Sequence, residues 1–452
     1  MPHIVATWRW RTVAYLTQAA PSRRGLRTQR ALQHTRAAQA SALARHVAQR
    51  TVACALHAHT TRKAQAAFSA SLPPPSGARR MSLLSNALAR ERNNFDLVRL
   101  LAASAVVYGH SFVLQQPDGH TDLATALLGF DYSGSLGVFA FFLLSGMLVT
   151  ASFDRQRSPM RFLALRASRI WPAVAGGALF VMFVLGPLFT TLPLHRYFSS
   201  PMTWGNLDTF STIVLGKRIQ APGVFEHNRF TSICEPLWTL PIEVRYYFVV
   251  LVTGMLGLLR TRRGMCVAVL IGMIPFLVHP HLAPHFYVSL RNLADKPGGY
   301  AFFPEPVFMA GMLLYAWRER VDINGWGAAA LCAAYLGLRG TPLAQPVFYL
   351  AFAYGVLWFG TTPLLHRFAP RNDYSFGIYI YGFPIQQSVA HLAPSLDHLS
   401  ALLIAAPVIY ACAWLSWHGV ERPAIRWTRK RLARARDAAR ADGTPMPEAA
   451  AR

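Results

Sequence analysis

The chain has 452 residues, of which 53% are hydrophobic and only 14% are charged, and its formal net charge at pH 7 is +25. So much apolar content with so little charge excludes an ordinary soluble domain. In a soluble protein the positive charge would indicate nucleic-acid binding. Here the arginines concentrate in the first eighty residues, in short connectors and in the tail. The positive-inside rule explains that distribution, so no nucleic-acid partner is expected.

Residues 1–80 differ in composition from the rest of the chain. Between Met1 and Arg90 there is no Asp or Glu, whereas Arg, Ala, Ser, Thr and His are abundant. Three interpretations stay open: an organellar transit peptide, a disordered basic arm on anionic lipid, or upstream sequence outside the native protein. We favour the third, with a start at Met81. The expected organisation is a basic disordered extension over 1–80, a transmembrane domain over 81–428 and a basic cytoplasmic tail over 429–452.

Apolar runs separated by short polar connectors recur from Phe95 to His418. They predict an all-α, polytopic membrane protein, because helices satisfy their own backbone hydrogen bonds in lipid. The ten expected spans are 95–115, 132–152, 173–193, 238–259, 265–283, 300–317, 324–339, 345–361, 374–393 and 400–418. The even-numbered connectors and the tail are basic, and the first connector contains no Lys or Arg. We therefore expect both termini to face the cytoplasm and the long connector 194–237 to face outward.

The first span carries three polar residues where an inert anchor would carry leucine: Asp96, Arg99 and His110. Eleven residues of helix make three turns plus about 20°, so Arg99 and His110 share one face about 16 Å apart along the axis. Asp96 lies three residues before Arg99 and can pair with it. Arg99 alone could instead extend to the interface, and His110 could be a satisfied core residue. Two such residues on one stripe favour a polar path through the membrane.

The second and third spans add a Ser-Gly pair and an arginine pair. Ser145 and Gly146 lie in "GVFAFFLLSGMLVT", where composition alone indicates close helix packing. Arg166 and Arg169, in "RFLALRASRIWP", are three residues apart on one helical face. Topology explains each arginine singly, but together they could also clamp the phosphates of a nucleotide-bearing acyl donor.

The fourth span opens with "EPLWTLPIEVRYYF", which places Glu243 about one turn inside the membrane and Trp238 near the interface. A carboxylate within a span is by default functional or paired. The sequence shows no nucleophile elbow, no phosphate-binding glycine loop and no Cys/His spacing typical of a metal site. We therefore expect no metal.

Taken together, these motifs resemble the acyltransferase type 3 family of integral-membrane O-acyltransferases from Asn94 to about Trp427. The resemblance rests on "FDLVRLLAASAVVYGH", "GVFAFFLLSGMLVT", "RFLALRASRIWP", "LWTLPIEVRYY", "FMAGMLLY", "DYSFGIYIYGFPIQQ" and "WHGVERPAIR", in family order. It differs at Gly382, where many relatives have His, and near Phe139, where many carry an acidic residue. Those two roles are absent here or filled by other residues.

The resemblance implies transfer of an acyl group, usually acetyl, from cytoplasmic acyl-CoA to a hydroxyl of a cell-envelope or exported carbohydrate, with no metal. Arg166 and Arg169 would then bind the coenzyme A phosphates, and His110 would act as general base. Arg99 would line the route, and Glu243 would orient His110 or bind the acceptor. Asp96, Ser145 and Trp238 would support the site.

The expected location is the bacterial inner (plasma) membrane, in contact with lipid. The protein would act alone or pass its acyl group to a separate periplasmic partner. A transporter or flippase of a glycan precursor is the competing interpretation, because buried polar stripes also describe a translocation path. A scaffold is a third interpretation, but it leaves Arg99, His110 and Glu243 without a purpose.

Overall fold

The computed structural model describes residues 83–88, 93–115, 121–278, 288–289, 291–293 and 299–441. Within these ranges the chain is mostly helical and forms no strand, which confirms the expected all-α character. Four helices are long and apolar enough to cross a membrane: Phe95–Gln115, Ser133–Gln156, Pro159–Phe189 and His398–Ala438. Ten spans and the side on which the termini lie stay predictions. The extension over 1–80 lies outside the described residues.

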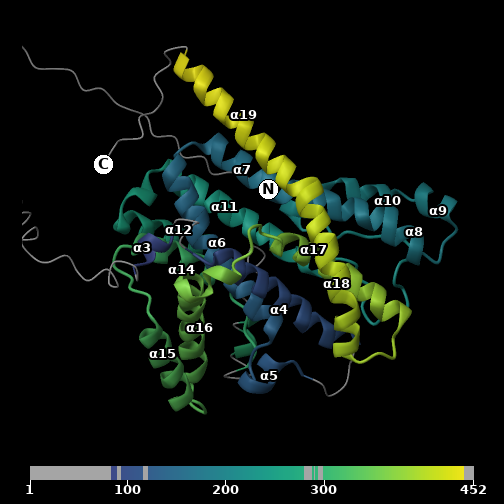
Figure 1. The fold of residues 1–452 in the computed structure, drawn as a ribbon, viewed down its shortest axis with the longest axis horizontal. Coiled ribbons are helices and arrows are strands. Elements are labelled where there is room, and N and C mark those ends of the chain that lie inside the picture. The colour runs from purple at the N-terminus through teal and green to yellow at the C-terminus, as the bar shows by residue number, and fades with distance from the viewer. Residues whose placement is uncertain are drawn as a thin grey trace, which may run out of the picture. The chain divides into compact units, whose positions relative to one another are not determined.

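Figure 1 labels the α-helices in chain order. Their bounds are α3 (Leu84–Ala87), α4 (Phe95–Gln115), α5 (Leu123–Leu128), α6 (Ser133–Gln156), α7 (Pro159–Phe180), α8 (Gly186–Phe189), α9 (Leu194–Ser199), α10 (Pro201–Trp204), α11 (Leu240–Met255), α12 (Arg262–Val278), α14 (Pro304–Ala316), α15 (Gly325–Gly337), α16 (Ala344–Thr361), α17 (Ser375–Leu392), α18 (His398–Ser416) and α19 (Arg422–Ala441). Two π-helical turns join neighbouring helices, η2 (Val181–Leu185) between α7 and α8 and η9 (Trp417–Glu421) between α18 and α19.

Side-chain caps and glycines fix several helix ends. The Asp397 carboxylate accepts hydrogen bonds from the amides of Leu399 and Ser400 at the start of α18. Asp122 accepts from the Thr125 amide at the start of α5, and that helix ends at Gly129 with φ of 78°. Acceptors at a helix start satisfy orphan amides, and glycine adopts the left-handed conformation without steric cost.

Helix α7 begins earlier than the sequence suggests. The basic stretch after Ser158 was expected to be a connector ahead of a span at 173–193, but the helix starts at Pro159 and runs through η2 to Phe189. Proline suits the first helical position, and the Arg, Leu and Ala residues that follow are good helix formers. The basic residues therefore lie within the helix and do not mark where it begins.

The predicted external connector 194–237 contains two short α-helices, α9 and α10, followed by a 3-10 turn and a π-helical turn, and it is anchored to the helix before it. Tyr197 in α9 is fully buried, and its hydroxyl donates to the Met182 carbonyl at 3.1 Å. A Cβ on Gly186 would lie 1.8 Å from that hydroxyl, so only glycine fits where α8 passes Tyr197. The connector therefore packs against the end of the α7–α8 segment.

Helix α6 packs closely against two other helices of the core. A Cβ on Gly146 would lie 2.0 Å from the Phe308 carbonyl oxygen of α14, and a Cβ on Gly311 would lie 2.3 Å from the Leu143 carbonyl oxygen. On the side of α4, a Cβ on Gly137 would lie 2.5 Å from the Ala102 carbonyl oxygen. The packing role expected for the Ser-Gly pair is thus filled by Gly146, which leaves the Ser145 side chain available for other contacts.

Candidate active site

A cavity of about 920 Å³ lies among α4, α6, α7, α11, α17 and α19. Its wall is strongly cationic, with nine arginines and three acidic side chains. The arginines come from four helices and one connector: Arg99, Arg155, Arg161, Arg166, Arg169, Arg371, Arg422, Arg426 and Arg429. The acidic side chains are Asp96, Glu243 and Asp373. Such a wall suits an anionic ligand.

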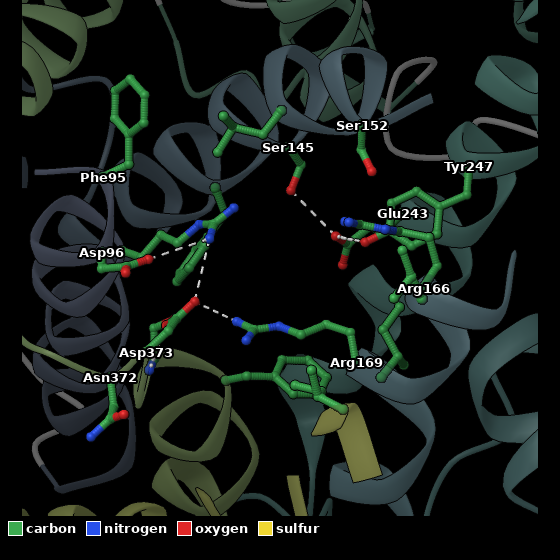
Figure 2. Close-up of a pocket in the computed structure, with 18 of the residues that line it drawn as sticks. Phe95, Asp96, Ser145, Ser152, Arg166, Arg169, Glu243, Tyr247, Asn372 and Asp373 are labelled. Atoms are coloured by element: carbon green, nitrogen blue, oxygen red, sulfur yellow. Dashed lines mark hydrogen bonds and ion pairs between the residues drawn. The ribbon is translucent and has the colours of Figure 1, made fainter. Parts of the chain in front are cut away.

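Asp373, just before α17, joins two of these arginines from other helices. Its carboxylate accepts hydrogen bonds from Arg99 of α4 at 3.3 Å, from Arg169 of α7, and from the Ser375 amide at 3.1 Å. Asp96 adds a second, longer ion pair to Arg99 at 3.8 Å. Figure 2 shows Arg169 pointing across the pocket to Asp373. These contacts hold α4, α7 and the start of α17 together at the cavity wall.

The two guanidiniums also set the charge of Asp373. Burial by itself raises the pKa of this carboxyl, but the positive charges of Arg169 and Arg99 outweigh burial and hold its pKa well below the ordinary value. Asp373 is therefore ionised at neutral pH. It neutralises part of the charge of Arg99 and Arg169, and the other arginines of the wall keep theirs.

The predicted pair Arg166 and Arg169 lines the cavity, but the two residues have different partners. Arg169 is bound to Asp373 and lies over the ring of Trp417 at 5.9 Å. Arg166 lies 5.8 Å from the centre of the Tyr247 ring, and its buried Nε has no hydrogen-bond partner among the described residues. An unsatisfied buried donor costs free energy that a bound anion would recover. Arg166 is thus the member of the pair that forms no ion pair with a described carboxylate.

Glu243 and Ser145, predicted separately from two spans, meet at the cavity wall. Ser145 Oγ donates to Glu243 Oε1 at 3.3 Å, and the Tyr247 hydroxyl donates to the same oxygen at 2.5 Å. Figure 2 shows both donors directed at the Glu243 carboxylate. Glu243 and Tyr247 lie four residues apart on α11 and so share a face. The described contacts of Glu243 are with these residues and not with His110.

His110 does not line the cavity. Its ring makes an edge contact with Phe383 at 5.2 Å, and no hydrogen bond of His110 is found within the described ranges. The cavity wall follows α17 as far as Tyr379, and Phe383 is four residues further, about 6 Å along the helix. The predicted stripe is therefore divided: Asp96 and Arg99 face the cavity, and His110 lies about one helical turn beyond its end.

Trp238 and the two departures from the family pattern lie away from the cavity wall. Trp238 packs against Phe302 at 5.7 Å, and Phe139 stacks on the same ring at 5.0 Å. A Cβ on Gly382 would lie 2.8 Å from a methyl group of Val107, so a larger residue there would require the Val107 side chain to shift.

Within the part of the chain that the structure describes, no group of three or more His, Cys, Asp or Glu side chains is placed to hold a metal ion. The side chains that line the cavity carry guanidiniums, hydroxyls and carboxylates, and His110 is not among them.

Comparison with known proteins gives a consistent result. The chain is 29% identical over 340 residues to the "O-acetyl transferase" of Shigella phage Sf6, covering 73% of this chain and 95% of that protein. It is 26% identical over 385 residues to "Nodulation protein 10" of Rhizobium leguminosarum bv. viciae, covering 76% and 96%. No solved structure matches. Since residues 92–418, most of the chain, match the family model described as "Acyltransferase domain", the protein belongs to the acyltransferase type 3 family.

Proposed function

We propose that the protein is a membrane O-acetyltransferase that moves an acetyl group from cytoplasmic acetyl-CoA to a hydroxyl of a cell-envelope or exported carbohydrate. Family membership and the relative named "O-acetyl transferase" support the reaction class. The observation that carries the proposal is the arginine-lined cavity, whose wall includes the Arg166 Nε without a hydrogen-bond partner among the described residues. Its location in the bacterial plasma membrane is part of the same proposal.

The cavity suits the donor in both size and charge. Coenzyme A carries a diphosphate and a ribose phosphate, and guanidiniums bind phosphates in bidentate fashion. Arg166 lines the cavity from α7, and Arg422, Arg426 and Arg429 line it from α19. Because basic segments stay on the cytoplasmic side of a membrane, these arginines also support entry of the donor from the cytoplasm.

The acyl end of the donor would extend toward the inner end of the cavity. There the hydroxyls of Thr239 and Tyr379 lie 2.7 Å apart, and His110 lies about one turn beyond Tyr379. In the proposed step the acceptor oxygen bonds to the thioester carbonyl carbon as the carbon–sulfur bond breaks. Neutral His110 takes the hydroxyl proton and returns it to the departing thiolate. Donor and acceptor then approach from opposite sides of the membrane.

Glu243 receives a different role from the one its position in the sequence suggests. Since Ser145 and Tyr247 donate to its carboxylate at the cavity wall, we assign it to the donor side and not to the orientation of His110. Ser145 and Tyr247 hold that carboxylate in place, and Arg166 lies beside the Tyr247 ring.

The test uses purified protein in liposomes with radiolabelled acetyl-CoA inside and carbohydrate acceptors outside. We expect label on carbohydrate with the wild type, a loss of about 10²- to 10⁴-fold with His110→Ala, and no change with His366→Ala, an exposed histidine outside the cavity. A His110→Ala protein of normal yield and stability that transfers at the wild-type rate would remove the general-base assignment.

The same experiment separates the competing functions. A transporter would carry unmodified glycan and leave the acetyl label on coenzyme A. Absence of transfer, together with equal O-acetyl content in the glycans of a deletion strain and its complemented form, would contradict the proposed function. Transfer that requires an added periplasmic protein would show that the acyl group is passed on by a partner.

A further inference from the structure

Helix α19 presents basic side chains in two directions, which are about 120° apart around its axis. From Arg422 to Arg436 the sequence contains seven Lys and Arg residues and no Asp or Glu. Arg422, Arg426 and Arg429 line the cavity. At 100° per residue, Trp427, Lys430, Arg431 and Arg434 fall within an arc of about 100° on another side of the helix. We call these four residues the outer face of α19.

The outer face is exposed and carries charge that no acidic side chain balances. The Trp427 side chain is 57% exposed, and Lys430, Arg431 and Arg434 are all exposed. Arg431 lies over the Trp427 ring at 4.2 Å. Within the described ranges no carboxylate forms an ion pair with Lys430, Arg431 or Arg434. These side chains can therefore bind an external anion.

The position of the outer face along the chain indicates which anion it meets. Helices α18 and α19 are continuous through η9, and the candidate span runs from His398 to Ala438. Trp427 is 29 residues after His398, at most about 44 Å along the helix, which matches the thickness of a bilayer with its headgroups. Figure 1 shows a change of direction between α18 and α19, where η9 lies, as π-helical turns often cause.

We propose that the outer face of α19 binds the headgroups of anionic phospholipids in the leaflet on the basic side of the membrane. An exposed tryptophan next to three basic residues is typical of a surface that contacts lipid headgroups. Tryptophan favours the membrane–water interface, and each basic side chain is attracted to anionic lipid. A soluble acidic protein could also bind the three basic residues, but it would not explain why Trp427 lies at the depth of the lipid headgroups. Another side of the same helix forms part of the cavity wall, so one helix would contact both the lipid and the acyl donor.

The experiment measures which lipid lies next to Trp427. Full-length protein is placed in bilayers of equal parts phosphatidylglycerol and phosphatidylcholine, with bromine, a tryptophan quencher, on one lipid or the other. Subtracting the signal of Trp427→Phe isolates this tryptophan from the other ten. Each basic residue near the surface enriches anionic lipid roughly fivefold, so brominated phosphatidylglycerol should quench Trp427 several-fold more than brominated phosphatidylcholine. High salt should reduce the difference.

Two variants with equal loss of charge test the assignment. Lys430→Gln with Arg431→Gln and Arg434→Gln should make the two brominated lipids equally effective. Arg260→Gln with Arg263→Gln and Arg320→Gln, three exposed arginines elsewhere, should leave the preference unchanged. Equal quenching by both lipids in the wild type, or no quenching by either, would overturn the proposal. Because the readout needs no acyl transfer, its failure and that of the proposed enzymatic function are distinguishable.

Discussion

Asp373 and Arg99 are 274 residues apart in the chain, yet their side chains form an ion pair of 3.3 Å at the cavity wall. Arg169, from a third element, binds the same carboxylate oxygen. The Asp373 side chain is only 3% exposed, so its charge depends on these two partners. The Asp373 carboxylate thus connects α4, α7 and the start of α17. It also determines that Arg99 and Arg169 are paired, whereas other arginines of the cavity wall form no ion pair among the described residues.

Replacing Asp373 by Asn should destabilise the fold by about 3 kcal/mol. Removal of one partner from a buried pair leaves an uncompensated charge, and the lower end of the usual range applies because Arg99 and Arg169 are 22% and 25% exposed. Unfolding in detergent followed by size-exclusion chromatography would measure the loss. Asp437→Asn, an exposed aspartate on α19, controls for the change in net charge. Equal stability of the two variants would show that the pair contributes little.

The contribution of Asp373 should disappear in acid. Its pKa is lowered in the folded state from an ordinary value of 3.8, because Arg169 and Arg99 outweigh the effect of burial. A lowered pKa gives stability that is complete above the unfolded value and is lost as the pH falls through the folded value. The stability difference between wild type and Asp373→Asn should therefore be constant above about pH 5 and shrink below about pH 4. A difference that grows in acid would contradict this assignment.

Helical periodicity predicts which residues share a face but not which helices meet. It placed Asp96 with Arg99 and Arg166 with Arg169, and all four line the cavity. Glu243 was selected as a carboxylate within a span and Ser145 through the family resemblance, and both also line the cavity. The meeting of Ser145 with Glu243 required the packing of α6 near α11.

Asp373 was missed for the same physical reason. It lies in a connector with Arg367 and Arg371, where topology alone explained the charges. Its partners belong to α4 and α7, so only the assembled fold identifies it. The helical stripe likewise could not show that the cavity ends about one turn before His110, because Tyr379 and Phe383 of α17 define that boundary. Long-range packing, which local patterns do not encode, supplied this part of the site.

Arg166 and Arg169 of α7 should differ when each is changed to Gln: the first substitution should weaken donor binding, and the second should lower stability. Arg166→Gln should raise the KM for acetyl-CoA about tenfold to hundredfold with little loss of stability, because a hydrogen bond to a charged group contributes about 1.5–3 kcal/mol. Arg169→Gln should mainly lower the unfolding temperature, since it removes a partner of Asp373. Initial rates over a range of donor concentrations, with unfolding curves for both proteins, would measure this. An unchanged KM for Arg166→Gln would exclude it from donor binding.

Asp131, in the connector before α6, should make stability depend on pH in the opposite direction from Asp373. It is 2% exposed, and burial raises its pKa from 3.8 to about 6. A raised pKa gives stability below the unfolded value that is lost as the pH rises through the folded value. The stability of the wild type relative to Asp131→Asn should therefore fall by up to about 3 kcal/mol between about pH 4 and pH 7.

Unfolding curves of both proteins across this pH range would test the prediction. Asn can still accept the hydrogen bond that the Tyr132 amide donates to Asp131 at 2.8 Å, so the substitution removes charge and keeps that contact. Asp437→Asn again controls for net charge. A stability difference that stays constant with pH would mean that Asp131 is solvated in the folded state.

The contact between α6 and α14 should tolerate no side chain at Gly146. A methyl group there would lie 2.0 Å from the Phe308 carbonyl oxygen, so Gly146→Ala would force the helices apart at a cost of about 1–3 kcal/mol. Gly355→Ala is the matched control, because that glycine lies within α16 and nothing lies within 4 Å of its added Cβ. It should be neutral or stabilising by up to about 1 kcal/mol, since alanine favours the helix.

The same substitution should affect activity. Because the position of Ser145 depends on that of α6, Gly146→Ala should also reduce acyl transfer, and Gly355→Ala should not. Equal unfolding temperatures for the two variants would show that the α6–α14 approach is not tight in the membrane.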